Sequence, residues 1–282
     1  MMLDFIPEIP ISDWTTDFTK WVTDKFAFLF DFIKDNFGSL MEFLTAQLMV
    51  IPPIIFILII AVLAFFLSGK KFGLAAFSIV GLWLIYNQGL WEHLMNTLVL
   101  VLIASALSVI IGIPVGILMA KSKIAETIIT PILDFMQTMP AFVYLIPAVA
   151  FFGIGMVPGV FASLIFASPP TVRFTNLGIR QVSKELVEAS DAFGSTGAQK
   201  LFKVELPMAK ATISAGINQT VMLALSMVVT ASMIGAPGLG REVLSALQRA
   251  QVGPGFVAGI GIVILAIIID RLTQSSSKKE NM

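Results

Sequence analysis

Apolar residues dominate the chain from residue 50 to residue 272, where they form seven long runs. Each run predicts a membrane-spanning helix, because about 20 apolar residues in an α-helix cross the roughly 30 Å hydrocarbon core of a bilayer. The seven runs are residues 50–67, 72–86, 96–120, 132–153, 158–179, 211–234 and 255–272. The second run is short, so it either crosses a locally thinned bilayer or forms a helical hairpin with the first.

Residues 13–45 show a different pattern, in which charged residues recur every three, four or seven positions and large apolar residues lie between them. This spacing predicts an amphipathic helix, broken near Gly38. Such a helix either lies at a membrane interface or packs on the flank of the protein. The expected N-terminal arm, residues 1–48, is therefore extracytoplasmic or interfacial and does not cross the membrane.

Composition also indicates a membrane protein, since 57% of the residues are hydrophobic and 13% are charged, whereas soluble domains contain about 25% charged residues. The formal net charge is zero, so charge gives no indication of nucleic-acid binding. The chain has no cysteine and a single histidine, His93, which argues against disulfides, thiol chemistry and a histidine-built metal site. We expect no metal site and no catalytic residue.

Lysine and arginine set the expected orientation, because they concentrate in the cytoplasmic loops of membrane proteins. With the N-terminus outside and the C-terminus inside, most of these residues fall on the cytoplasmic side. The expected organisation is then two accessory spans in residues 49–90, a core of spans in residues 91–272 and a polar cytoplasmic tail in residues 273–282. One hydrophilic segment, residues 181–210, becomes a cytoplasmic loop inside the core.

This hydrophilic segment contains the sequence ELVEASDAFGSTGAQKLFKVELP and predicts two short helices. Good helix formers extend from Lys184 to about Phe193, and Gly194 is a typical C-terminal stop. A second helix is expected from Thr196 to Val204. Leu206-Pro207 then sets the direction of the chain before it re-enters the membrane.

The spacing in this loop is Glu188-Ala189-Ser190, three residues, Gly194, nine residues, Val204, one residue and Leu206-Pro207. It resembles the EAA loop of the permease subunits of ATP-binding-cassette (ABC) importers, which reads Glu-Ala-Ala, three residues, Gly, nine residues, Ile, one residue and Leu-Pro. Ser190 and Val204 are the two departures. In that family the loop is the coupling helix, which docks in a groove of a separate cytoplasmic ATPase.

A narrower resemblance extends from about residue 90 to residue 272. Residues 133–163, 169–194 and 216–240 are similar to permease subunits of importers for glycine betaine and related osmoprotectants, especially the Gram-positive betaine permease that works with a separate lipid-anchored binding protein. The resemblance implies an all-α, polytopic type I ABC importer permease in the bacterial cell membrane. It also implies a permease homodimer, two ATPase subunits and an extracytoplasmic substrate-binding lipoprotein as partners.

The resemblance implies a non-catalytic subunit that uses energy from its partner. The chain has no GxxxxGK[ST] phosphate-binding loop, so ATP and magnesium are expected on the ATPase, and no cofactor is expected on this chain. Small residues in the loop allow close approach to a partner, and Phe193 offers an apolar anchor. The residues expected to contact or position the ATPase are Glu188, Ala189, Ser190, Ala192, Phe193, Gly194, Val204, Leu206 and Pro207.

Residues of the translocation path are harder to identify from the sequence. Polar side chains inside spans are functional candidates because their burial in lipid is costly, but such residues also join helices by hydrogen bonds. The glycine-rich segment from residue 235 to residue 255 is either an outer gate that touches the binding protein or a tight turn. The candidates for the path and gate are Gln137, Tyr144, Asn218, Gln219, Gly238 and Gly240. Asp134 and Arg173, both within apolar runs, are candidates for an ion pair.

The main alternative function is an ion-gradient-driven secondary transporter of a small zwitterion. Such a protein is expected to contain inverted repeats and a carboxylate that binds a proton or sodium ion near the middle of the membrane. The sequence has no convincing repeat, and the acidic candidates in the core, Asp134 and Asp270, are near the predicted inner ends of their spans. The sequence therefore favours the ATP-driven importer.

Overall fold

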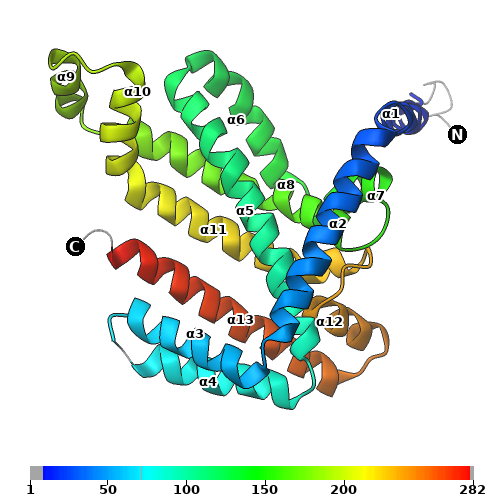
Figure 1. Ribbon diagram of the computed structural model, residues 1–282. Helices are drawn as coiled ribbons and strands as arrows, with labels where there is room; N and C mark the ends of the chain where they lie inside the picture. The colour runs from blue at the N-terminus through cyan, green and yellow to red at the C-terminus, as the bar shows by residue number, and fades with distance from the viewer. Residues whose placement is uncertain (1–8, 71, 280–282) are drawn as a thin grey trace, which may run out of the picture.

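The computed structural model describes residues 9–70 and 72–279, and these residues contain helices and no strand (Figure 1). The all-α prediction is confirmed. The α-helices are α1 Ile11–Lys25, α2 Ala27–Val50, α3 Pro53–Leu67, α4 Phe72–Asn87, α5 Trp91–Lys121, α6 Lys123–Thr138, α7 Leu145–Phe152, α8 Met156–Arg180, α9 Lys184–Ala192, α10 Gly197–Lys200, α11 Leu206–Ser232, α12 Leu239–Gln248 and α13 Val252–Lys279. A 3₁₀ helix, Ala141–Tyr144, precedes α7, and a π-helix, Leu201–Glu205, joins α10 to α11.

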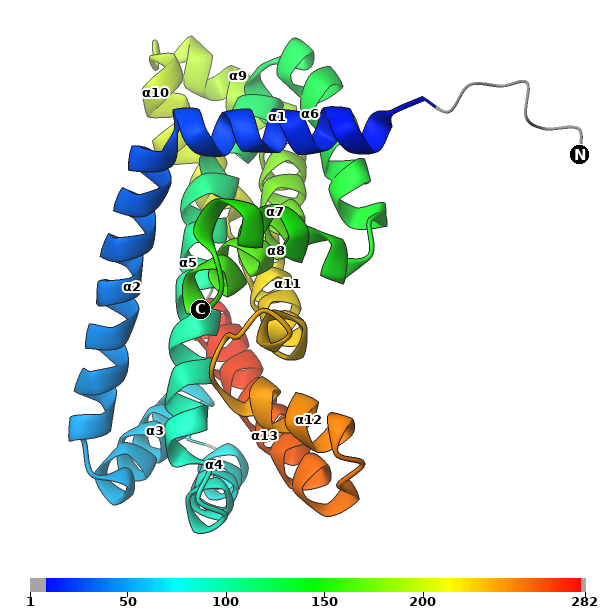
Figure 2. The same ribbon diagram turned by 90° about the vertical axis from the view of Figure 1, so that its right-hand side faces the viewer.

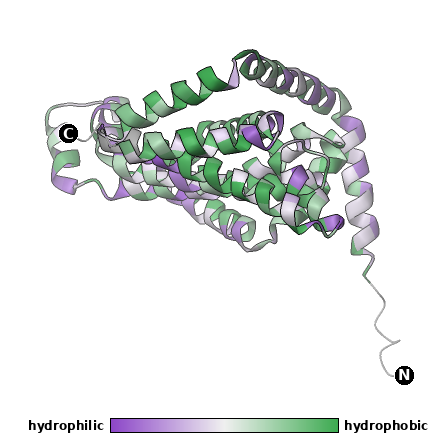
Figure 3. Ribbon diagram, turned by 90° about the horizontal axis from the view of Figure 1, so that it is seen from below, coloured by the Kyte–Doolittle hydropathy of each residue, from purple (hydrophilic) through white to green (hydrophobic). Residues whose placement is uncertain are grey.

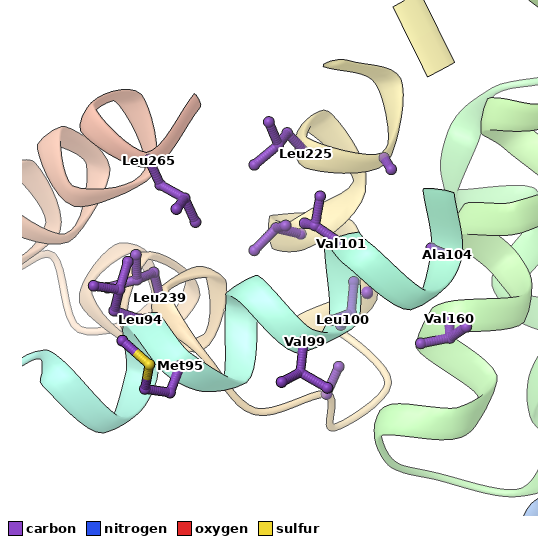
Figure 4. Packing of buried hydrophobic residues seen from close by; sticks show 14 of the residues in the cluster. Leu94, Met95, Val99, Leu100, Val101, Ala104, Val160, Leu225, Leu239 and Leu265 are labelled. Atoms are coloured by element: carbon purple, nitrogen blue, oxygen red, sulfur yellow. The ribbon is translucent and has the colours of Figure 1, made fainter. Parts of the chain in front are cut away.

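Three helices form the centre of the bundle, with α8 packed between α5 and α11. Glycines let α5 and α8 approach closely: a Cβ atom on Gly116 would lie 2.5 Å from the Cβ of Thr175, and one on Gly112 would lie 2.9 Å from the Cγ2 of Thr171. Toward the α12 end of the bundle, side chains from α5, α8, α11, α12 and α13 form one apolar core (Figure 4).

Among the described residues, three helical segments are long and apolar enough to cross a membrane by themselves, namely 91–121, 197–232 and 252–274. The number rises to five if each of two sharply bent helix pairs counts as one span. The predicted number of seven spans is therefore not confirmed. α8 is long enough, but its polar residues and paired prolines reduce its hydropathy, and most of its length is buried.

The fourth predicted span, residues 132–153, is wrong as a single helix. α6 ends at Thr138, and the chain bends by 110° before α7. Met139 is extended, with ψ of 136°, because the residue before a proline avoids the α-helical region and Pro140 has no N–H to continue the helix. The 3₁₀ helix and α7 therefore leave the direction of α6, as Figure 1 shows.

The N-terminal arm consists of two helices, α1 and α2, that meet at Phe26. The predicted break near Gly38 is wrong, since α2 passes through this residue, where the missing side chain leaves room beside Val157 of α8. Figure 2 shows α2 alongside the bundle and α1 turned across it. Figure 3 shows that hydrophilic residues are interspersed along both helices, while α3 is hydrophobic along its length.

The arm is attached to the bundle by aromatic packing. The ring of Phe30 in α2 stacks on Phe151 at a centroid distance of 4.8 Å and meets Phe152 edge-on at 5.6 Å. The large apolar side chains of α1, by contrast, are exposed, among them Trp14, Phe18 and Trp21. α2 therefore packs on the flank of the protein, while α1 presents an apolar face of the kind that lies at a membrane interface.

Two loops at the α12 end of the bundle are joined to each other. One loop connects α7 to α8 and the other connects α11 to α12. The N–H of Gly155 in the first loop donates to the carbonyl oxygen of Ile234 in the second at 2.9 Å. A Cβ atom on Gly235 would lie 2.6 Å from the side chain of Ile154, so the loops are in close contact.

The last helix extends from the predicted span into the polar C-terminal segment. Helix α13 continues to Lys279, beyond the predicted end of the span at residue 272. The predicted polar tail, residues 273–282, is therefore helical as far as residue 279, and residues 280–282 lie outside the described part of the chain.

Candidate functional site

The EAA-like loop, residues 184–207, projects from one end of the bundle as α9, α10 and the π-helix (Figure 1). Ser183 caps the start of α9, since its hydroxyl accepts a hydrogen bond from the N–H of Leu186 at 3.3 Å. At the other end Gly194 has a φ of +73°, a left-handed conformation that glycine adopts without steric cost. The predicted first helix and its glycine stop are confirmed.

The second half of the loop begins with a capping box. The hydroxyl of Thr196 accepts from the N–H of Gln199 at 3.3 Å, and the side chain of Gln199 accepts from the N–H of Thr196 at 2.9 Å. The predicted second helix therefore starts at the expected residue. It consists of α10 and the π-helix, and it continues directly into α11.

An ion pair joins the two halves of the loop. The Nζ atom of Lys200 lies 2.8 and 2.9 Å from the two carboxylate oxygens of Asp191. Ser190 is buried, and its hydroxyl donates to the carbonyl oxygen of Val187 at 2.7 Å. The burial of Ser190 and the ion pair between α9 and α10 make the loop a compact unit rather than an extended connection.

The residues predicted to contact or position the ATPase fall into two groups in the structure. Those on the outer surface are exposed: Glu188, Ala189, Ala192, Phe193, Gly194 and Pro207. Those toward the bundle are buried or half-buried: Ser190, Val204 and Leu206. Phe193 is 90% exposed, the highest value among the large apolar side chains of the described residues.

Sequence reasoning missed two features of the loop. The first is Phe202, an exposed apolar side chain close to Phe193 in the sequence. The second is Glu205, which is buried and forms an ion pair with Lys121 at the end of α5. Helical periodicity after Thr196 gives no signal for the burial of Glu205, because its partner is 84 residues away. A cavity of about 260 Å³ lies beside this pair and is also lined by Arg180, Lys184 and Glu188.

The residues predicted for the translocation path lie on α6, the 3₁₀ helix, α11 and the start of α12. Gln137 is exposed at the end of α6, whereas Tyr144 is buried in the 3₁₀ helix and donates from its hydroxyl to the carbonyl oxygen of Met136. Asn218 in α11 donates to the carboxylate of Asp270 in α13 at 3.0 Å, while the neighbouring Gln219 is exposed.

The two predicted gate glycines lie at the start of α12, at the opposite end of α11 from the EAA-like loop. A Cβ atom on Gly238 would lie 2.5 Å from the hydroxyl oxygen of Thr97, and one on Gly240 would lie 2.4 Å from the carbonyl oxygen of Val228. The hydroxyl of Thr97 also accepts from the N–H of Leu239 at 2.8 Å. In this structure both glycines therefore allow α12 to pack closely on α5 and α11.

Charged side chains join α6 to α8. The guanidinium of Arg173 donates to the carboxylate of Asp134, so the predicted ion pair is confirmed. Two turns away, Arg180 pairs with Glu126 at 2.9 Å and also donates to the carbonyl oxygen of Met119 at 3.0 Å. The second pair lies next to the EAA-like loop, so the ends of α5, α6 and α8 meet there.

Comparison with known proteins gives consistent matches. Residues 112–280 match the family described as the inner membrane component of binding-protein-dependent transport systems. The chain is 58% identical over 276 residues to the glycine betaine/carnitine transport permease protein GbuB of Listeria monocytogenes, covering 97% of this chain and 98% of that protein. It is 50% identical over 278 residues to the glycine betaine transport system permease protein OpuAB of Bacillus subtilis, covering 99% and 98%.

A solved structure supports the fold. The inward-facing MetNI methionine ABC transporter contains a chain that superimposes with a TM-score of 0.57 at 23% identity, covering 70% of this chain and 94% of that one. This similarity concerns the arrangement of the helices, while the curated relatives establish the sequence relationship over almost the whole length. The chain therefore belongs to the family of inner membrane components of binding-protein-dependent transport systems.

Proposed function

We propose that this chain is the membrane permease subunit of an ATP-driven importer of glycine betaine or a related quaternary-ammonium osmoprotectant. The observation that carries the proposal is the EAA-like loop, a compact helical unit with an exposed phenylalanine, in a chain with two betaine permeases among its relatives. The name of one relative also includes carnitine. The substrate class is therefore quaternary ammonium zwitterions, with glycine betaine as the first to test.

The proposed partners follow from the same observations. A permease homodimer forms the path, two ATPase subunits bind at the EAA-like loops, and an extracytoplasmic lipoprotein delivers the substrate. ATP and magnesium belong to the ATPase, and this chain catalyses no reaction. The exposed surface of α9, with Glu188, Ala192 and Phe193, contacts the ATPase, because small side chains permit close approach and an exposed aromatic side chain gains most from burial.

The proposed mechanism uses the loop as a mechanical contact. Closure of the two ATPase subunits displaces the EAA-like loop, and the helices change from an inward-open to an outward-open arrangement. The change requires only that the ATPase contacts have different free energies in the two arrangements. In this proposal the loop faces the cytoplasm, the arm lies outside, and Gln137 and Gln219 line the path. Tyr144, Asn218, Gly238 and Gly240 maintain the helix packing around it.

Reconstitution tests the proposed function. The permease, its ATPase and its binding protein in proteoliposomes are expected to accumulate labelled glycine betaine only when ATP is enclosed with the ATPase. An ionophore that removes the ion gradients is expected to leave uptake unchanged. Uptake that needs an ion gradient and proceeds without ATP would establish the secondary transporter instead.

A further inference from the structure

The carboxylate of Glu205 is buried at the junction between the EAA-like loop and α11. The residue is 5% exposed, and it is the last residue of the π-helix. A buried carboxylate without a partner is costly, and Glu205 has its partner in the ammonium group of Lys121. The loop is thus connected to a helix that lies far from it in sequence by an ion pair whose carboxylate is buried and whose lysine is exposed.

Lys121 is the last residue of α5, where several contacts converge. Arg180, the last residue of α8, donates to the carbonyl oxygen of Met119, two residues before Lys121, and pairs with Glu126 of α6. α5, α6 and α8 are therefore tied together at this end without the loop. The pair between Lys121 and Glu205 adds the loop to that group.

Apolar side chains also join the loop to α5 next to this ion pair. Leu201 and Leu206, at the two ends of the π-helix, pack against a buried cluster formed by Ile179, Ala209 and Ile213. Ile117 and Ala120 of α5 contact the same cluster. π-Helical turns are rare and occur frequently at functional sites, and here the turn places Glu205 toward α5 rather than toward solvent.

We propose that Glu205 is a positioning residue that fixes the EAA-like loop to α5 through Lys121, so that displacement of the loop moves α5. The inference rests on the proposed function, since it concerns the route by which ATPase motion reaches the helices. Without the ion pair the loop still folds through its own caps and its Lys200–Asp191 pair, but the apolar cluster alone transmits its motion to α5 less completely. The expected defect is less transport for each ATP hydrolysed.

The test measures transport per ATP hydrolysed in proteoliposomes that contain the complete complex, with labelled glycine betaine as the probe. Glu205→Gln is expected to reduce this ratio at least about fivefold, the lower range of typical coupling between sites, with assembly and hydrolysis retained. Lys123→Gln is the matched control, because Lys123 is two residues from Lys121 and its side chain is 82% exposed where it pairs with Glu126. The control is expected to retain the wild-type ratio.

Two further variants keep the inference falsifiable if Glu205→Gln fails to insert. Lys121→Gln removes the same contact from its more exposed side, and the exchange of both charges, Lys121→Glu with Glu205→Lys, is expected to restore the ratio. A wild-type ratio in Lys121→Gln or Glu205→Gln overturns the inference, as does an exchanged pair that assembles but stays uncoupled. Absence of ATP-dependent uptake in the wild-type complex would instead contradict the proposed function.

Discussion

Gly194 shows how one backbone angle decides the shape of the EAA-like loop. Its φ is +73°, and no heavy atom of the described residues lies within 4 Å of where a Cβ would be. The glycine is therefore required by conformation, since a left-handed residue with a side chain costs about 1–2 kcal/mol. Space around the residue is not limiting.

This distinction predicts a difference between two glycines of the same loop. Gly194→Ala is expected to reduce ATPase binding and uptake, because the new side chain disfavours the turn that ends α9. Gly197→Ala, also in open space but at the first residue of α10, is expected to be neutral or slightly stabilising, since alanine favours a helix by up to about 1 kcal/mol over glycine. Co-purification of the ATPase with each variant measures the difference, and equal behaviour of the two variants would contradict it.

Phe193 leads to a second prediction at the residue scale. Its side chain is 90% exposed, and truncation of a buried interface aromatic typically costs about 2 kcal/mol or more. Phe193→Ala is expected to weaken ATPase binding by a factor of about ten or more, with unchanged insertion. Phe256→Ala is the control, because Phe256 is 69% exposed on α13 at the other end of the bundle. A binding assay in detergent gives both affinities, and retention of binding in Phe193→Ala would exclude this side chain as an anchor.

At the scale of elements, the sequence predicts helices well where the signal is local. The Ser183 and Thr196 caps and the Gly194 stop are short-range, so the loop helices could be located to within a few residues. The sequence predicts a single span across Met139, although Pro140 is a local signal for a kink, because the apolar run continues across the bend. The sequence wrongly predicts a break at Gly38, because a glycine that faces a neighbouring helix looks the same in sequence as a glycine that ends the helix in which it lies.

The α5–α8 contact gives a prediction for a whole element. Gly116→Ala would place a Cβ 2.5 Å from Thr175, and overpacking of this kind typically costs about 1–3 kcal/mol. The variant is expected to unfold at a lower temperature in detergent than the parent protein. Gly259→Ala on α13, which has no described atom within 4 Å of the new Cβ, is expected to match or exceed the parent. Equal thermal stability of the two variants would show that α8 adjusts to the added methyl group.

For the whole molecule, the amino-acid sequence predicts which side of the membrane each loop faces. The positions of the helices alone do not give this orientation. Lysine and arginine placement predicts the EAA-like loop inside and α12 outside. The Glu205–Lys121 pair depends on tertiary packing, as do the contacts of Tyr144, Asn218, Gly238 and Gly240 with neighbouring helices. Local sequence therefore predicts neither the burial of these residues nor their partners.

The cysteine-free sequence makes this topology measurable with single substitutions. In vesicles that contain the permease without its ATPase, Ala192→Cys in α9 is expected to react with a membrane-impermeant thiol reagent only when the vesicles are inside-out. Leu247→Cys in α12, where the native side chain is 75% exposed, is expected to react only in right-side-out vesicles. Labelling of both positions from one side would contradict the proposed orientation.

The hydrogen bond between Gly155 and Ile234 has a consequence for how the molecule opens at the α12 end. The bond fastens the start of α8 to the segment that follows α11, and these two helices also pack along their length. A separation of the helices at that end must therefore either break this hydrogen bond and the contact between Gly235 and Ile154, or move the two loops together as one rigid unit. In the second case, the arm, whose Phe30 packs on Phe151 and Phe152, moves with that unit.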